Sequence, residues 1–158
     1  GVLDAASYWP HVVTDAGTAY DPAMLATLHA ADMASWAATD PAAVALVEEL
    51  QRAGIGLGLL SNIPTELADR YAGMPWLRGF AVVGFSCRIG FAKPDGRAFD
   101  WALAQCAALG VAAPGILFVD DSPANIAAAA TKGMATHHFT SVARLRADRR
   151  IQSLLAVG

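Results

Sequence analysis

The sequence predicts an α/β protein whose parallel β-sheet is covered by helices on both faces. Two observations support this prediction. From residue 54 onward, short apolar runs alternate with helical patterns at the spacing of βαβ units. Hydrophobic residues also make up 55% of the 158 residues and charged residues only 16%, which supplies a buried core and argues against disorder. The length suits one domain, or one domain with a small appendage.

The first 39 residues have a helical pattern. Asp21-Pro22 restarts a helix after an interruption at Gly17, and Asp40-Pro41 supplies the N-cap and first residue of another helix. We therefore divide the chain into a helical segment, residues 1–39, and an α/β core, residues 40–158.

The core contains four short apolar runs that are typical of buried parallel strands. They cover residues 55–60, 80–85, 116–119 and 134–138, and the helices between them begin at Pro64 or cover residues 95–109 and 122–132. In such a sheet, functional groups gather at the carboxyl ends of the strands. Three polar segments are candidates for that edge: Ser61-Asn62, Lys93-Pro94 and Asp120-Asp121-Ser122.

The adjacent carboxylates of Asp120 and Asp121 are the strongest of these signals. Two carboxylates at the end of an apolar strand repel each other and lose solvation, which is costly unless a cation is present. Mg²⁺ suits such a site, because it takes one or two carboxylates and keeps several waters. Ser122 is predicted to be the N-cap of the next helix. Alternatively, the two aspartates form a turn and a helix cap, which explains one carboxylate but not both.

Lys93 and Ser61 are weaker signals when each is taken alone. Lys93 precedes Pro94, which favours an extended backbone at the mouth of a helix, where a lysine can reach a phosphate as a point charge. Ser61 ends a strand and can donate hydrogen bonds to a phosphoryl oxygen. Each residue also has an ordinary explanation, as a surface lysine and as part of a chain-reversing turn.

The order of these segments resembles motifs II, III and IV of the haloacid dehalogenase (HAD) superfamily. The matching segments are LLSNIP (residues 59–64), GFAKPD (90–95) and FVDDSPANI (118–126). The resemblance extends over residues 6–146, and its branch includes the phosphatase domain of bifunctional epoxide hydrolases and the haloacid dehalogenases. SYW (7–9) and DMASW (32–36) resemble the helical cap of that branch. The resemblance implies a Rossmann-like three-layer fold, with residues 1–39 as a partial helical cap.

The resemblance also implies roles for individual residues. Ser61 would bind the transferring phosphoryl group, with Asn62 beside it, and Lys93 would bridge the nucleophile and the phosphoryl oxygens. Asp121 would be the Mg²⁺ ligand, and Asp120 would act behind it or through a water. Asn125 stands where many members of the superfamily have a further aspartate.

The superfamily's first motif, an apolar strand followed by the nucleophilic aspartate, has no counterpart before the cap-like segment. Asp15 is the one candidate, and we reject it because SYWP before it matches cap sequence. We therefore expect a chain that begins inside the cap, lacks the central first strand and is inactive. The strands at 55–60 and 116–119 should then not pair directly. An N-terminal peptide or, alternatively, a second copy of the chain would complete the sheet.

The resulting hypothesis is a Mg²⁺-dependent phosphatase that acts on a small phosphorylated metabolite through an aspartyl-phosphate. A 2-haloacid dehalogenase-like hydrolase and a non-catalytic HAD-like binding protein remain alternatives. The net charge of −3 and the absence of a basic run predict no nucleic-acid partner, and no apolar stretch predicts a membrane segment.

Several other residues have structural interpretations. The cysteines, Cys87 and Cys106, form no disulfide framework and favour a reducing cytoplasm, where both would be core residues. We interpret His137-His138 as a packed or solvated pair rather than a metal site. Arg144, Arg146, Arg149 and Arg150 are interpreted as one solvated helix face.

Overall fold

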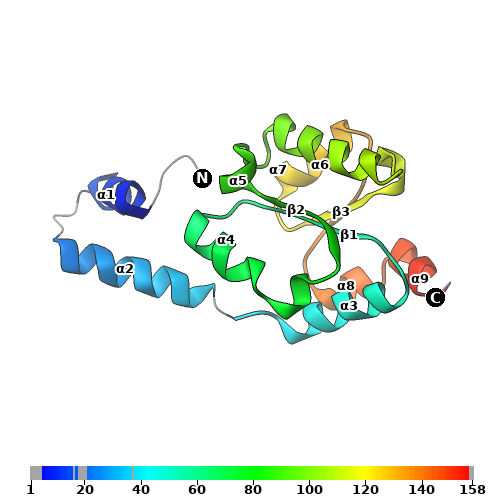
Figure 1. Cartoon of the computed structure of the whole chain (residues 1–158), viewed down its shortest axis with the longest axis horizontal. Coiled ribbons are helices and arrows are strands. Elements are labelled where there is room, and N and C mark those ends of the chain that lie inside the picture. Colours follow the sequence, from blue (N-terminus) through cyan, green and yellow to red (C-terminus); the bar gives the residue numbers. More distant parts are fainter. Residues whose placement is uncertain (1–4, 16, 18–20, 37, 157–158) are drawn as a thin grey trace.

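A computed structural model describes residues 5–15, 17, 21–36 and 38–156 and confirms the α/β class. The longer helices are α1 (Ala5–Asp15), α2 (Pro22–Ser35), α3 (Pro41–Arg52), α4 (Thr65–Ala72), α6 (Gly96–Ala108), α7 (Pro123–Thr131) and α9 (Arg149–Ala156). The shorter ones are α5 (Ser86–Ile89), α8 (Val142–Arg146) and the 3-10 turns η1 (Pro75–Leu77) and η2 (Ala113–Gly115). Helices lie on both faces of the strands (Figure 1).

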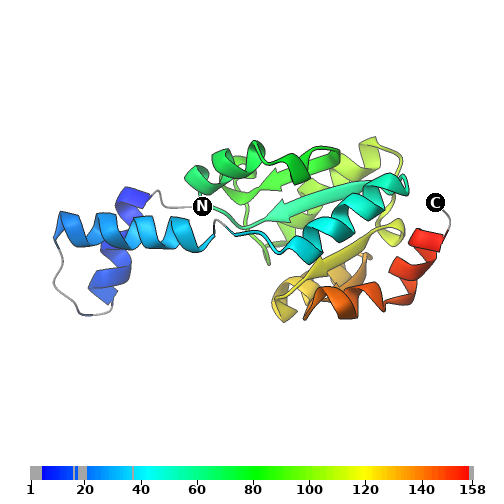
Figure 2. The same ribbon diagram turned by 90° about the horizontal axis from the view of Figure 1, so that it is seen from below.

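The four strands form two separate parallel pairs rather than one continuous sheet. Strand β1 (Leu57–Ser61) pairs with β2 (Phe80–Phe85), and β3 (Leu117–Asp120) pairs with β4 (Ala135–His138). Within the described residues, β1 and β3 are not hydrogen-bonded to each other. The prediction that these two strands do not pair directly is therefore confirmed. Figure 2 shows β1 (cyan to green) and β3 (yellow) running in similar directions.

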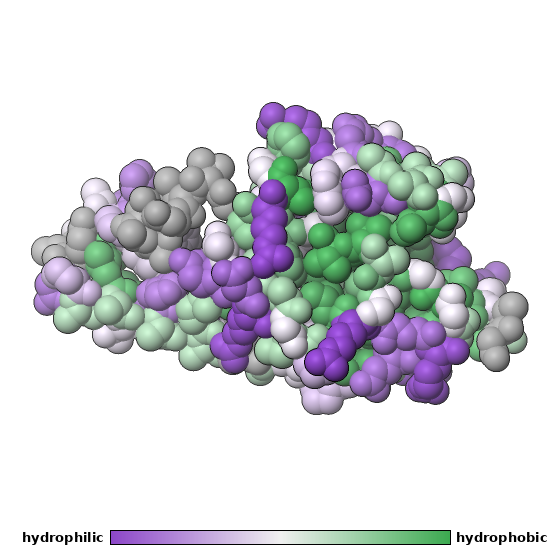
Figure 3. Space-filling model, viewed as in Figure 1, coloured by the Kyte–Doolittle hydropathy of each residue, from purple (hydrophilic) through white to green (hydrophobic). Residues whose placement is uncertain are grey.

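Strands β1 and β3 are less buried than the sequence predicts. No residue of β1 is fully buried, and Asp120 is the only buried residue of β3. The sequence predicts fully buried strands because their residues are apolar, and this prediction is wrong because each strand has a hydrogen-bonded neighbour on one side only. Figure 3 shows a hydrophobic patch near the middle of this face of the molecule, bordered by hydrophilic side chains.

Three clusters of buried residues form the core. One lies around α4 and the end of β2, one joins α3 to α8 and α9, and one joins α6 to α7. In the last cluster, the ring of Phe99 on α6 packs edge-on against that of Phe118 on β3, with centroids 5.4 Å apart. This contact fixes one face of β3, the strand that ends in Asp120.

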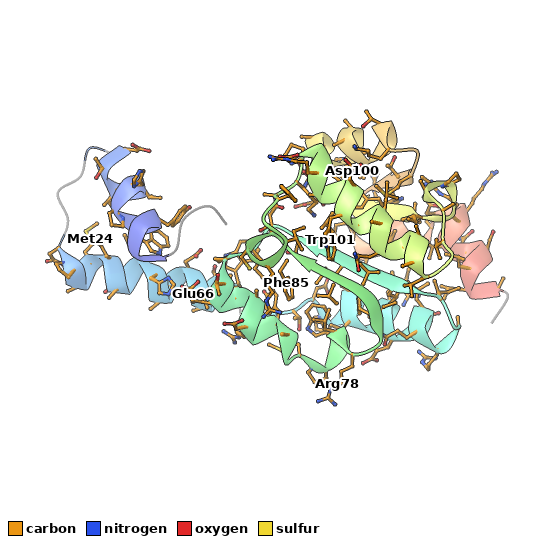
Figure 4. The ribbon with its side chains drawn as sticks, turned by 45° about the horizontal axis from the view of Figure 1, so that its top comes forward. Met24, Glu66, Arg78, Phe85, Asp100 and Trp101 are labelled. Carbon is orange, nitrogen blue, oxygen red and sulfur yellow. The ribbon has the colours of Figure 1, made fainter. Side chains whose placement is uncertain are left out.

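Helices α1 and α2 stand off from the rest of the molecule, with Met24 near the outer end of α2 (Figures 2 and 4). Helix α2 has no buried residue. The helix begins at the predicted Asp21-Pro22 pair, where Asp21 is the N-cap and accepts a 2.7 Å hydrogen bond from the backbone N–H of Met24. At its other end, the Tyr71 hydroxyl on α4 donates a 2.6 Å hydrogen bond to the carbonyl of Trp36. The division of the chain at residues 39 and 40 stays a prediction.

The structure places Asp15 at the end of helix α1 rather than after a strand. This agrees with its rejection as a nucleophile that follows a strand. Asp40 caps α3 as predicted, accepting a 2.8 Å hydrogen bond from the backbone N–H of Ala42. In the described part of the chain, no helix is both long and apolar enough to cross a membrane.

The basic residues near the end of the chain do not form one solvated helix face. They are divided between α8 and α9, and two of them form ion pairs. Arg146 lies 2.6 Å from Glu49 of α3, and Arg150 lies 2.8 Å from Asp148. The prediction is wrong because acidic partners come both from a distant helix and from the connection between α8 and α9.

Candidate active site

The candidate site lies where β1 and β3 end. Ser61 is the last residue of β1 and Asp120 the last residue of β3, and Asp121 follows directly. Lys93 lies in the connection between α5 and α6, and its bond to Pro94 is cis. Direct contacts link Lys93 both to Asn62, beside Ser61, and to Asp120. Three of the sequence-predicted segments therefore meet at one edge of the fold.

Lys93 and Asp120 form an ion pair in the interior of this edge. Lys93 Nζ lies 2.6 Å from Asp120 Oδ2, and the two side chains are 11% and 5% exposed. The ammonium also lies 5.5 Å from the centroid of the Phe118 ring, within reach of a cation–π attraction. Because both charges are withdrawn from water, each depends on the other for stabilisation.

The second oxygen of Asp120 is held by two further donors. Oδ1 accepts hydrogen bonds from the backbone N–H of Ser122 and from Asn125 Nδ2, both at 2.9 Å. Burial alone raises the pKa of Asp120, but the hydrogen bonds from Lys93, Ser122 and Asn125 outweigh it and lower the pKa below its ordinary value. Asp120 is therefore an ionised, fully engaged carboxylate at neutral pH.

Ser122 occupies the predicted N-cap position of α7, but its hydroxyl makes no capping hydrogen bond. Its backbone N–H instead donates to Asp120. The predicted N-cap residue is therefore confirmed by its position, whereas the side-chain capping hydrogen bond is not formed. Asn125, in the first turn of α7, is buried and donates the other hydrogen bond to Asp120 Oδ1.

Asp121 differs from its neighbour in being exposed. Among the described residues, its carboxylate has no hydrogen-bond or ion-pair partner, while its backbone oxygen lies 2.9 Å from His138 Nε2. No group of three or more His, Cys, Asp or Glu side chains forms a metal cluster in the described part of the chain. A single free carboxylate fits Mg²⁺, which binds through one or two carboxylates and otherwise keeps water and substrate oxygens.

Ser61 and Asn62 follow one another at the end of β1, but their side chains differ in their contacts. The Ser61 hydroxyl forms no hydrogen bond within the described residues and is half-buried. The Asn62 amide binds the backbone of Lys93 twice, through Nδ2 to the carbonyl and through Oδ1 to the N–H, both at 2.7 Å. The sequence does not predict this link, because no local pattern joins residues 31 positions apart.

His137 and His138 have separate partners. His137 Nδ1 lies 2.8 Å from Asp148 Oδ2, and both side chains are largely buried. Hydrogen bonds from Arg150 and then from His137 hold the pKa of Asp148 well below its usual range. Cys87 and Cys106 are free thiols and only partly buried, and burial raises the pKa of Cys106.

A model of the haloacid dehalogenase-like hydrolase family matches residues 9–133. This chain belongs to that family. The match includes Ser61, Lys93, Asp120 and Asp121. No curated protein gives a significant match to the sequence.

Several solved structures share the fold. An uncharacterized protein from Corynebacterium glutamicum is 24% identical with a TM-score of 0.58, and the match covers 73% of this chain and 81% of that one. A HAD phosphatase from Thermococcus onnurineus is 20% identical with a TM-score of 0.57, covering 69% and 57%. A dehalogenase solved with an intermediate complex is 21% identical with a TM-score of 0.56, covering 68% and 55%. The chain thus spans little more than half the length of the last two proteins.

Proposed function

We propose that this HAD-like chain carries the phosphoryl-binding part of a Mg²⁺-dependent phosphatase. The substrate would be a small phosphorylated metabolite, cleaved through an aspartyl-phosphate. The observation that supports this proposal most directly is the difference in contacts between two adjacent carboxylates. Asp120 is engaged by three protein donors, one of them the ammonium of Lys93, while Asp121 is exposed and free to bind a cation.

Lys93 and Ser61 would contact the phosphoryl group. Lys93 supplies a positive charge that is fixed by Asp120 and partly withdrawn from water, where its attraction for a phosphoryl oxygen is stronger than in bulk solvent. Ser61 offers a hydroxyl without a competing partner in the described structure. These groups bind and orient a phosphoryl group before any bond to phosphorus breaks.

Asp121 would hold the metal ion, whose bound charge would offset that of the phosphoryl oxygens. His138 contacts the backbone oxygen of Asp121 and so limits the movement of this residue. Asp120 would influence the metal only indirectly, because its oxygens already accept hydrogen bonds.

The nucleophile of the proposed reaction is not supplied by the described site. Asp120 is fully engaged, Asp121 is the proposed metal ligand, and Asp15 belongs to helix α1. Formation of an aspartyl-phosphate needs a free carboxylate in line with the phosphorus atom. We therefore expect the 158 residues to bind a phosphoryl group without turning it over, unless a further aspartate joins the site.

Two other functions predict different ligands. A dehalogenase-like hydrolase would have to release a halide beside Asp121, whose negative charge is unpaired among the described residues and disfavours an anion in the absence of a metal. A non-catalytic HAD-like protein would bind a partner without needing Lys93 or Asp121. The buried Lys93–Asp120 pair and the free Asp121 favour the phosphatase.

Anion selectivity tests the proposal. Calorimetric titration with orthophosphate and with bromide, each with and without Mg²⁺, should show binding of orthophosphate only, and tighter binding with Mg²⁺ than without it. Lys93→Ala should weaken this binding about tenfold or more, as expected for a lost charge-assisted hydrogen bond. Lys132→Ala is the matched control, because Lys132 pairs with Asp100 at 2.6 Å on α6. If bromide binds without metal more tightly than orthophosphate does, the result would instead favour a dehalogenase. If neither anion binds, it would favour a non-catalytic protein.

A further inference from the structure

Asn62 connects two segments of the candidate site through its side chain. It directly follows Ser61, the last residue of β1. Its amide donates from Nδ2 to the Lys93 carbonyl and accepts at Oδ1 from the Lys93 N–H, and both distances are 2.7 Å. One side chain therefore satisfies both backbone polar groups of Lys93. Residue 93 lies in a connecting segment, where no strand or helix would otherwise supply these bonds.

Two contacts fix Lys93 at opposite ends of the residue. Asn62 holds its backbone, and Asp120 holds its Nζ at 2.6 Å. A lysine side chain has four rotatable bonds and loses much conformational entropy when its tip is fixed. Holding the backbone reduces the number of conformations from which the Lys93–Asp120 pair must form. Because Asn62 adjoins Ser61 in the chain, the same link sets the distance between Lys93 and Ser61.

We propose that Asn62 is a positioning residue that places Lys93 relative to Ser61 and Asp120. Its function in catalysis rests on the phosphatase proposed above, in which Lys93 and Ser61 bind the same phosphoryl group. Asn62 acts through the backbone of Lys93, so its loss changes the position and accessibility of the Lys93 ammonium.

Because the chain contains few lysines, the accessibility of the Lys93 ammonium can be measured without an activity assay. The sequence has two lysines, Lys93 and Lys132. Their side chains are 11% and 28% exposed, and each forms an ion pair. Brief acetylation of the folded 158-residue chain, followed by peptide mass spectrometry, gives a Lys93-to-Lys132 labelling ratio in which Lys132 is an internal reference. In the wild-type chain, Lys93 should be the slower of the two to react.

Asn62→Ala removes two hydrogen bonds and should raise the Lys93-to-Lys132 ratio at least about fivefold, the factor that corresponds to one net hydrogen bond. Gln51→Ala is the matched control. It also removes a long-range side-chain hydrogen bond to a backbone carbonyl, from Gln51 Nε2 to Arg78 at 2.7 Å, but it leaves Lys93 untouched. The control ratio should equal that of the wild-type chain. An unchanged ratio in a folded Asn62→Ala chain, or an equal rise in Gln51→Ala, overturns the proposal.

Asn62→Asp provides a second variant in case Asn62→Ala does not fold. It keeps an acceptor for the Lys93 N–H and removes the donor to the Lys93 carbonyl, so its ratio should lie between those of the wild type and Asn62→Ala. A wild-type ratio in this variant counts against the proposal. Titration with orthophosphate and Mg²⁺ separates this inference from the proposed function. If the wild-type chain does not bind orthophosphate while the labelling ratio still rises, the phosphatase fails and the positioning of Lys93 by Asn62 stands.

Discussion

Lys93 Nζ lies 2.6 Å from Asp120 Oδ2, although the two residues are 27 positions apart in the sequence. This ion pair decides which of the two adjacent aspartates is free. The charge of Asp120 is paired with that of Lys93, and Ser122 and Asn125 also bind its carboxylate, whereas Asp121 is exposed. The Asp120-Asp121 sequence therefore corresponds to one carboxylate that organises the protein and one that is available to a ligand.

Magnesium binding should depend on Asp121 far more than on Asp120. In NMR titrations with Mg²⁺, the amide signals of residues 121 and 122 should shift in the wild-type chain and stay unchanged in Asp121→Ala. Asp120→Asn should only weaken the binding, because Asp120 acts through its hydrogen-bond partners. Equal loss in both variants, or in neither, would show that we have assigned the two carboxylates wrongly.

The purified 158-residue chain should not hydrolyse p-nitrophenyl phosphate, even with Mg²⁺. The groups of the site bind and neutralise charge, but the one free carboxylate among them, Asp121, is assigned to Mg²⁺, which leaves no carboxylate to act as the nucleophile in the described structure. Release of p-nitrophenolate at 405 nm checks this. Turnover that disappears in Asp15→Asn would mean that Asp15 is the nucleophile after all.

Gly84 on β2 should not tolerate a larger residue, because Trp101 points from α6 towards this strand (Figure 4). A Cβ at this position would lie 2.5 Å from Trp101 Cζ3 and 3.0 Å from Leu60 Cδ1. We expect Gly84→Ala to lower the free energy of unfolding by about 1–3 kcal/mol in urea denaturation. Gly58→Ala on the neighbouring strand is the control, because its Cβ would make only an ordinary contact, 3.6 Å from Val82 Cβ. Equal effects of the two substitutions would contradict the packing described.

The contacts of Asp148 should make stability depend on pH in the acidic range. Its pKa in the folded chain lies well below the usual value. The stabilisation is therefore complete above a pH of about 4, the ordinary aspartate pKa, and is lost as pH falls towards the folded-state pKa. Asp148→Asn should lower the Tm at pH 7. The Tm values of the variant and the wild-type chain should converge as pH falls below the ordinary aspartate pKa of about 4.

Asp95→Asn is the control variant for the pH dependence of the Tm of Asp148→Asn. Arg97 lowers the pKa of Asp95 to about 2, but this pair lies at the surface. Asparagine also keeps an acceptor for the cap of α6. We expect a smaller change in Tm than for Asp148→Asn. A Tm difference for Asp148→Asn that is constant from pH 7 to pH 3 would argue against the ion pair as its cause.

The sequence predicts the order of the elements well, because strand runs and helix caps are local signals. Asp40 caps a helix as expected, a helix begins at Asp21-Pro22, and Asp120 and Ser61 end their strands. The strand limits are shifted: the strand predicted at residues 55–60 is Leu57–Ser61 in the structure. Gly54, with positive φ, and the two residues after it form the connection before the strand instead.

The contacts within the site could not be predicted in the same way. The links from Asn62 to Lys93 and from Lys93 to Asp120 span 31 and 27 positions, and they depend on how separate connections approach each other. The pairing of Arg146 with Glu49 was missed for the same reason. Sequence patterns place each residue on its element, whereas the partners of these side chains are determined by packing.

The most direct test of the phosphatase account is the coupling between Mg²⁺ and orthophosphate. If Asp121 holds a metal beside the phosphoryl group bound by Lys93 and Ser61, each ligand must tighten the binding of the other by the same factor. We predict a factor of at least about five in paired calorimetric titrations of the wild-type chain, and a factor near one in Asp121→Ala. Independent binding of the two ligands to the wild-type chain would contradict a shared Mg²⁺–phosphoryl site.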